Sequence, residues 1–308
     1  MALTFQLTVF SDPQGEAAAR VYVVAVPNRD APADELAAYR LSGQIIGPTC
    51  RYSSTLQTKI PFHHRGLTPC GDRTALLAEA LVPDPCYWST ELPFLYRAVG
   101  QITGTDADPT PFDQTFGIRS VGVLRNKLTF NGKVWVPRCI AANEVLADIP
   151  LLQWRETAVT RLTDAASDEL CQAASETGVC IITIVRGGGQ STCESLTRLS
   201  RYPAVVASII DSHESLDREL RTAAPNVLLG RFCDRALIPS DSDATQFLVV
   251  TSQDGMPSGM KYAQPTGLPV LTMSDMLEVS SLTNARASCD RLQRELAGKH
   301  DIAGYIVT

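Results

Sequence analysis

The chain has 308 residues, of which 44% are hydrophobic and 19% are charged, and its formal net charge is −6. This composition allows about two domains with buried cores and excludes a disordered chain. The sequence pI is about 5.3 and no cluster of Lys or Arg stands out, which argues against binding to nucleic acid or to an anionic membrane surface.

The apolar runs, the cysteines and the histidines indicate where the protein resides and whether it binds a metal. No apolar run approaches the roughly 20 residues that span a bilayer. The N-terminal MALTFQLTVF lacks a basic start and a cleavage site, so we expect no signal peptide. The nine cysteines form no Cys-x-x-Cys pair and lie among apolar residues, as buried reduced thiols do. The four histidines have no ligand spacing with them. These patterns predict a cytoplasmic protein without a metal or another cofactor.

Residues 1–118 have the pattern of an antiparallel β-sandwich. Short apolar or alternating segments are separated by Pro and Gly, and no long helical period appears. His63 and His64 fall in this half, and we expect them in an exposed turn rather than in a metal site. The predicted strands are LTFQLTVF, RVYVVAVP, YRLSGQII, CRYSSTLQTKIPF and ALLAEALV.

Residues 119–308 alternate apolar runs with amphipathic segments. Continuous apolar runs that are followed by helices indicate parallel strands buried on both faces. Eight such runs indicate a small (β/α)8 TIM-like barrel, shorter than the usual length of roughly 200 residues or more. Helices around strands five to seven should therefore be short or missing, and an incomplete barrel stays open as an alternative. The runs are residues 134–142, 157–162, 179–185, 204–210, 226–232, 247–251, 268–273 and 302–308.

Four segments between the runs carry helix signals. Residues 167–178 have apolar residues at helical spacing and end at a Gly. Residues 212–225 begin with a capping-box spacing and end at a Pro, and residues 274–300 are long enough for one or two helices. Residues 191–200 follow the stretch RGGGQST, which could cradle a phosphate at the helix start or form a flexible loop.

The junction between the two halves carries a specific succession of motifs. They are VPDPCYWSTELPFLYRAVGQI (82–102), FGIRSVGV (116–123) and NGKVWVPR (131–138). This succession resembles glycoside hydrolase family 2, the β-galactosidase and β-glucuronidase family, in which an immunoglobulin-like domain ends in such motifs before the first barrel strand. The resemblance implies a structural role for these residues, and Thr90 departs from the family's Pro. The matching residues are Trp88, Ser89, Glu91, Pro93, Leu95, Tyr96, Phe116, Gly117, Arg119, Asn131, Gly132 and Lys133.

The resemblance continues more weakly through the barrel. DELCQAASETGVCIIT (168–183) is similar to a helix-and-strand segment of the family. YPAVVASII (202–210) resembles the strand that carries the acid/base, and TGLPVLTMSD (266–275) resembles the strand that carries the nucleophile. The implied architecture is an N-terminal immunoglobulin-like β-sandwich over residues 1–118, followed by a barrel over residues 119–308 that resembles a glycoside hydrolase catalytic domain.

The catalytic positions of the resemblance are altered. A retaining glycosidase needs two carboxylates roughly 5 Å apart. Counting along the strands places His213 where the family has its acid/base Glu, and Met273 or Ser274 where it has its nucleophile. The resemblance therefore implies a degenerate active site without standard retaining hydrolysis, and a role in carbohydrate binding or interaction.

Two alternatives to this interpretation stay open. One is an active glycosidase that uses displaced carboxylates, namely Asp211 or Glu214 together with Asp275. The other is a purely structural or assembly module. Its uncovered barrel strands would form an apolar patch, which a homodimer could bury.

Charged residues at the ends of the runs form a second pattern. The C-terminal face of a (β/α) barrel is where they would converge, to bind a sugar, a divalent cation or a cationic ligand. Asp211 and Asp275 also stand where helix N-caps belong, whereas Asp234 and Asp254 have no obvious helix after them and are better ligand candidates. The expected ligand-binding residues are Arg186, His213, Asp234 and Asp254, and Arg161 ends an earlier run.

Overall fold

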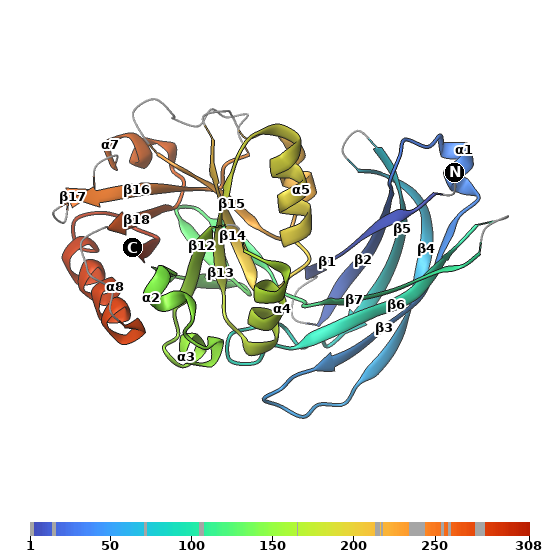
Figure 1. Cartoon of the computed structure of the whole chain (residues 1–308), viewed down its shortest axis with the longest axis horizontal. Helices are drawn as coiled ribbons and strands as arrows, with labels where there is room; N and C mark the ends of the chain where they lie inside the picture. Colours follow the sequence, from blue (N-terminus) through green and yellow to red (C-terminus); the bar gives the residue numbers. More distant parts are fainter. Residues whose placement is uncertain are drawn as a thin grey trace. The chain divides into compact units, whose positions relative to one another are not determined.

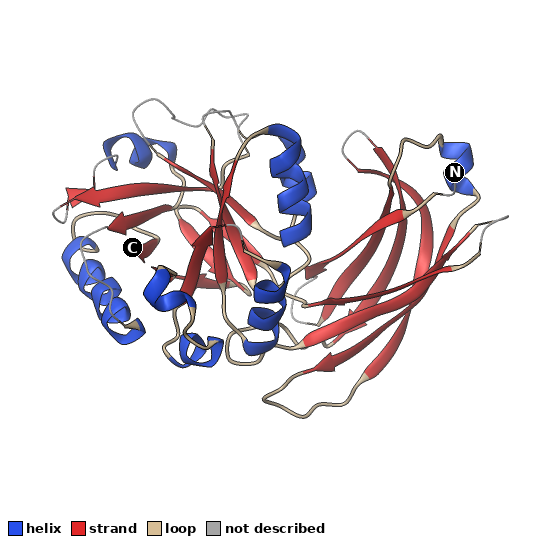
Figure 2. Cartoon of the chain, in the orientation of Figure 1, coloured by secondary structure: helices blue, strands red, loops and turns tan. Residues whose placement is uncertain are grey.

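The chain forms two compact units. The structure is a computed structural model, and it describes residues 3–13, 17–70, 73–104, 108–164, 166–212, 216, 218–233, 244–253, 256–257, 260–274 and 281–308. One unit comprises Met1–Ser120 with Arg201–Pro203, and the other comprises Val121–Ser200 with Ala204–Thr308. The first unit consists mainly of strands, whereas helices surround the strands of the second (Figure 1, Figure 2).

The first unit is a seven-stranded antiparallel β-sandwich with the sheet order β1-β2-β5-β4-β3-β6-β7. Grouping β1, β2, β5 and β4 against β3, β6 and β7 gives the connectivity of constant-type immunoglobulin domains. The long strand β4 joins the two groups, because its first half pairs with β3 and its second half with β5. The elements are β1 (Phe5–Pro13), β2 (Ala18–Pro27), α1 (Ala33–Ala37), β3 (Arg40–Thr49), β4 (Thr58–Cys70), β5 (Arg73–Pro83), β6 (Leu95–Thr103) and β7 (Thr110–Phe116).

Alternation along the strands builds the sandwich core. Val21, Val23 and Ala25 of β2 are buried in the core, as the pattern of RVYVVAVP predicts. The predicted turn at His63 and His64 is wrong, because β4 continues through both residues to pair with β5, although His63 is exposed as expected. The ring of His64 accepts a hydrogen bond at Nδ1 from the N–H of Leu41, at 3.4 Å.

The motif-rich segment before β6 is structural, as the resemblance implies. Trp88 is fully buried, and its main-chain N–H donates a hydrogen bond to the carbonyl of Ile118 at 2.7 Å. The hydroxyl of Tyr96, in β6, accepts a hydrogen bond from the N–H of Cys86 at 2.8 Å. The Tyr96 ring stacks on Phe116, with centroids 5.8 Å apart. A sixth-strand Tyr that bonds the upstream main chain is the tyrosine corner of immunoglobulin-like sandwiches.

The second unit contains a closed parallel barrel of eight strands. Neighbours pair in the order β11-β12-β13-β14-β15-β16-β18-β19, and β19 pairs with β11 to complete the ring. All eight predicted runs contribute a strand to this ring, and the alternative of an incomplete barrel is wrong. The strands are β11 (Arg138–Ala141), β12 (Thr160–Asp164), β13 (Ile181–Arg186), β14 (Val205–Asp211), β15 (Leu228–Phe232), β16 (Phe247–Gln253), β18 (Val270–Ser274) and β19 (Gly304–Val307).

Short antiparallel strands accompany the barrel. β8 (Val121–Leu124), β9 (Lys127–Phe130) and β10 (Lys133–Trp135) form a separate three-stranded sheet. The run at residues 134–142 therefore divides into β10 and β11, because Pro137 between them has no N–H for a strand ladder. β17 (Met256–Pro257) pairs antiparallel with β16.

Helices connect the barrel strands. α4 confirms the helix that residues 167–178 predict: the Ser167 side chain caps its start, and Gly178 ends it in the left-handed conformation at φ 86°. α6 and α7 are short, as the small barrel predicts. Among the described residues no helix is long and apolar enough to cross a membrane. The helices are α2 (Glu144–Ala147), α3 (Leu151–Glu156), α4 (Asp168–Thr177), α5 (Gly189–Leu199), α6 (Arg218–Ala223), α7 (Met260–Ala263), the 3-10 helix η1 (Gln264–Thr266) and α8 (Leu282–Leu296).

The barrel strands are well covered. The large apolar side chains that are exposed in the described part of the chain lie outside the eight barrel strands. The apolar patch that we expected for a structural or assembly module is therefore not found on the described barrel strands.

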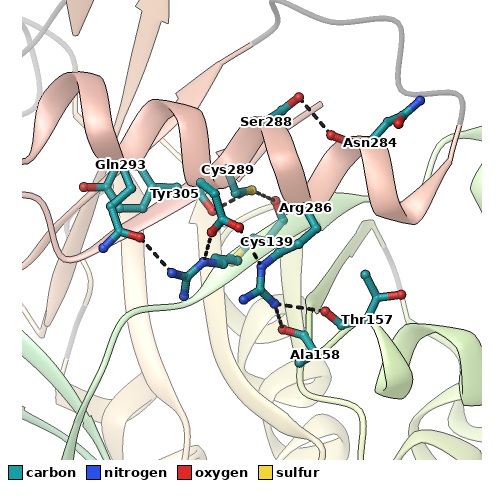
Figure 3. Close-up of polar contacts among 11 residues, drawn as sticks. Cys139, Thr157, Ala158, Asn284, Arg286, Ser288, Cys289, Gln293 and Tyr305 are labelled. Atoms are coloured by element: carbon teal, nitrogen blue, oxygen red, sulfur yellow. Dashed lines mark hydrogen bonds and ion pairs between the residues drawn. The ribbon is translucent and has the colours of Figure 1, made fainter.

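Polar contacts fasten α8 to the first barrel strand (Figure 3). Asp290 accepts a hydrogen bond from Arg138 Nε at 2.5 Å and lies 3.4 Å from Arg286 Nε. Arg138 also donates to Gln293 at 2.8 Å, and Arg286 donates to the main-chain carbonyls of residues 157 and 158 at the end of α3. Because Arg138 belongs to β11 and α8 precedes β19, these contacts join the two ends of the ring.

Candidate functional site

Three charged side chains meet at the carboxyl ends of neighbouring strands. Asp164, Arg186 and Asp211 are the last residues of β12, β13 and β14. The parallel register sets Arg186 beside Asp211, and Asp164 beside Ile184. Side chains two residues apart in a strand share a face, so Ile184 and Arg186 place all three charged residues on one face of the sheet. We call these three residues the mouth triad.

Arg186 bridges the two acids of the mouth triad. Its Nη2 lies 2.7 Å from Oδ2 of Asp164, and its Nε lies 3.6 Å from Oδ2 of Asp211. The arginine side chain is 68% exposed, and the two aspartate side chains are 50% and 51% exposed. Exposed ion pairs contribute about 0–1 kcal/mol each, so a ligand can replace these contacts at little cost.

The mouth triad presents hydrogen-bonding groups of both kinds. Carboxylate oxygens accept hydrogen bonds, and a guanidinium donates up to five. Neighbouring hydroxyl groups of a sugar or another polyol need both kinds of partner. In the described ranges there is no group of three His, Cys, Asp or Glu side chains that could hold a metal ion.

Two sequence interpretations need correction. Asp211 is not a helix N-cap, because it ends β14 and α6 begins only at Arg218. Arg161 does not reach the mouth. It is 7% exposed, its guanidinium carbon lies 5.0 Å from the ring centre of Trp154, and its Nη2 donates to the carbonyl of Ala147 at 3.3 Å. Burial lowers the pKa of Arg161.

Strand parity explains why Arg161 and Asp164 differ. They are three residues apart in β12 and therefore face opposite sides of the sheet. Sequence reasoning missed Asp164. Its signal is an Asp just after the second apolar run, the same signal that identified Asp211 after the fourth.

Of the other candidate residues, the structure describes only those of the seventh barrel strand. His213, Glu214, Asp234, Asp254 and Asp275 lie outside the described residues. Met273 and Ser274, at the expected nucleophile position, both lie in β18 and are 8% and 1% exposed. The described site therefore consists of the mouth triad, of which Arg186 and Asp211 were predicted.

An immunoglobulin-like sandwich followed by an eight-stranded barrel is the fold of glycoside hydrolase family 2 β-glucuronidases, as the junction motifs imply. No protein-family model and no curated protein matches the sequence. The likeness is therefore one of structure.

Three solved structures illustrate the likeness. Parabacteroides merdae β-glucuronidase with glycerol in its active site matches 99% of this chain with a TM-score of 0.61 and 12% identity. A putative β-galactosidase from Bacteroides fragilis matches 97% with a TM-score of 0.60 and 13% identity. Bacteroides uniformis β-glucuronidase 2, covalently bound to cyclophellitol-6-carboxylate aziridine, matches 98% with a TM-score of 0.61 and 14% identity. This chain spans 47%, 54% and 45% of those chains, about half their length. At such identities the likeness shows the fold alone.

Proposed function

We propose that the barrel mouth holds carbohydrate and does not carry out the retaining hydrolysis of glycoside hydrolase family 2. In this proposal the barrel of residues 119–308 carries the ligand site, and the sandwich of residues 1–118 is a separate domain. The observation that carries the proposal is the bridge from Arg186 to Asp164 and Asp211, at the end of the barrel where ligands of this fold bind.

The bridge disfavours retaining hydrolysis for a physical reason. That reaction needs a protonated carboxyl group as acid, and a second carboxylate roughly 5 Å away that is free to attack the anomeric carbon. Here one guanidinium engages both carboxylates of the mouth triad, so in this arrangement neither of them is free to attack. Binding needs no such freedom, because a sugar hydroxyl can exchange hydrogen bonds with either group as it stands.

The seventh strand supports the same proposal. Its expected nucleophile position falls on Met273 or Ser274, which offer a thioether or a hydroxyl and are nearly fully buried. Neither is a carboxylate that could form a glycosyl ester of the usual kind. Solved proteins with this fold are named β-glucuronidases and β-galactosidases, so β-glucuronides and β-galactosides are the first carbohydrate classes to test.

A binding titration with 4-nitrophenyl β-D-glucuronide and 4-nitrophenyl β-D-galactoside tests the proposal. We expect saturable binding of at least one glycoside, without release of 4-nitrophenolate. Arg186→Ala should weaken that binding by about ten-fold, because it removes charge-assisted hydrogen bonds. The matched control is Arg291→Ala. Arg291 lies 4.0 Å from Glu295 within α8 and is not part of the mouth triad, so its loss should leave binding unchanged.

The two parts of the proposal fail in different ways. Saturable release of 4-nitrophenolate that Glu214→Gln abolishes would show hydrolysis by displaced carboxylates. Equal binding by Arg186→Ala and the unaltered protein, or no saturable binding of either glycoside, would contradict the assignment of carbohydrate to the mouth triad.

A further inference from the structure

A pocket of about 150 Å³ lies between α5 and α6. The turn at residues 187–189 and the first turn of α5 form one wall, and Glu219 of α6 stands on the opposite side. Ile210 and Leu216 supply apolar lining. Ile210 precedes Asp211 in β14, and adjacent residues of a strand face opposite sides. The pocket is therefore on the helix side of the barrel and separate from the mouth triad.

The wall of this pocket is an uncapped helix start. Gly188 occupies the N-cap of α5, no side chain caps the helix, and its first turn contains no acid. Among the described residues, the N–H groups of residues 189–191 have no hydrogen-bond partner. Gly187 and Gly189 have φ of 116° and 58°, which favour glycine, and nothing stands within 4 Å of where a side chain would begin. The glycines thus leave the helix start open to a ligand.

Thr192 provides a second, independent observation at this pocket. It lines the pocket and is 1% exposed, and its hydroxyl has no hydrogen-bond partner in the described structure. Other helical hydroxyls bond the carbonyl four residues back: Thr197 bonds Cys193 at 2.9 Å, and Ser175 bonds Cys171 at 2.7 Å. An unsatisfied buried hydroxyl costs about 1–3 kcal/mol. A ligand oxygen in the pocket would remove that cost.

We infer that this pocket binds a small tetrahedral oxyanion of the phosphate class, either free phosphate or the phosphoryl group of a sugar phosphate. The described lining offers main-chain N–H donors, the Thr192 hydroxyl and the positive end of the α5 dipole. Glu219 is exposed at the rim, and its charge weakens anion binding without filling the site. The inference does not depend on the carbohydrate proposal, because it uses a different face of the barrel.

Titration of the full chain with inorganic phosphate tests this inference, by calorimetry or by phosphorus NMR. We expect saturable binding with a dissociation constant on the order of 1 mM. Thr192→Val removes the hydroxyl while keeping the side-chain shape, and should weaken binding about five-fold. Thr197→Val is the same substitution in the same helix outside the pocket lining and should have no effect. Glu219→Gln should tighten binding, because it removes a like charge from the rim.

A parallel titration with glucose 6-phosphate separates the two sources of the anion. Tighter binding than that of inorganic phosphate would assign a sugar phosphate, and equal binding would assign free phosphate. Absence of saturable binding up to about 50 mM phosphate, or equal affinities for Thr192→Val and Thr197→Val, would overturn the inference. If Thr192→Val fails to fold, as judged by circular dichroism, Glu219→Gln decides: unchanged or weaker binding would overturn the inference as well.

Discussion

Replacing Asp290 by Asn tests how α8 fastens the ends of the barrel together. The carboxylate of Asp290 lies between Arg138 of β11, at 2.5 Å, and Arg286 of α8, at 3.4 Å. Asn keeps the shape and can still accept one hydrogen bond, but it leaves the two guanidinium groups without their shared counter-charge. We therefore expect Asp290→Asn to lower the free energy of unfolding.

The size of this effect follows from the exposure of the three side chains. Asp290 is 35% exposed, Arg138 25% and Arg286 29%. Solvent screening limits such contacts to about 0.5–1 kcal/mol each, so Asp290→Asn should cost about 1–2 kcal/mol at pH 7. Urea denaturation followed by circular dichroism measures this difference directly.

The same variant predicts a pH dependence. Burial alone would raise the pKa of Asp290, but the hydrogen bond and charge of Arg138 and the charge of Arg286 outweigh burial and lower it. A carboxyl group with a lowered folded pKa stabilises the fold above its unfolded pKa of about 3.9, and this stabilisation is lost as the pH falls through the folded pKa. The difference in unfolding free energy between the unaltered protein and Asp290→Asn should therefore be largest near pH 7 and shrink below about pH 4.

Glu295→Gln is the matched control on the same helix. Glu295 lies 4.0 Å from Arg291, and the two side chains are 51% and 47% exposed. Glu295→Gln should lower the free energy of unfolding by less than about 0.5 kcal/mol. Equal unfolding free energies for Asp290→Asn and Glu295→Gln, or an Asp290→Asn effect that is the same at pH 3.5 and pH 7, would show that Asp290 does not stabilise the fold through its two arginines.

Three further predictions concern other buried or strained positions. Tyr96→Phe leaves the partly buried main-chain N–H of Cys86 without its acceptor and should lower the free energy of unfolding by about 1 kcal/mol in urea denaturation; no loss would argue against the tyrosine corner. Ala158 has a φ of 52°, so Ala158→Gly should stabilise the protein by up to about 1 kcal/mol, and a lower melting temperature would contradict this. Burial raises the pKa of the Cys171 and Cys289 thiols to about 12. In alkylation at pH 8 followed by mass spectrometry, both should react more slowly than the less buried Cys50, and equal rates would be inconsistent with this burial.

Burial on both faces explains why the barrel strands could be predicted. Runs such as VCIITIV and AVVASII are continuous because helices cover one side and the barrel interior the other. Local sequence could not give the bounds of β4, because the polar pair His63 and His64 suggests a turn, whereas pairing with β5 extends the strand. Cross-strand pairing depends on residues distant in sequence, and it overrode the local signal.

The site was harder to predict because it depends on strand ends to within one residue. A shift of one position moves a side chain to the opposite face of a strand. For this reason Arg161 was expected at the mouth and is buried against Trp154, while Asp164, three residues later, was overlooked. Arg186 and Asp211 were expected there, since each follows an unambiguous apolar run. Their pairing is a matter of register, which the sequence does not show.

Intact-mass spectrometry after exposure to cyclophellitol-6-carboxylate aziridine shows whether the barrel mouth carries a nucleophilic carboxylate. This reagent is covalently bound to Bacteroides uniformis β-glucuronidase 2 in its solved structure, and retaining hydrolysis likewise requires a nucleophilic carboxylate. If the barrel mouth holds carbohydrate without retaining hydrolysis, the protein should keep its unmodified mass while still binding a glycoside reversibly. A stoichiometric adduct that peptide mapping places on Asp211, Glu214 or Asp275 would contradict that claim.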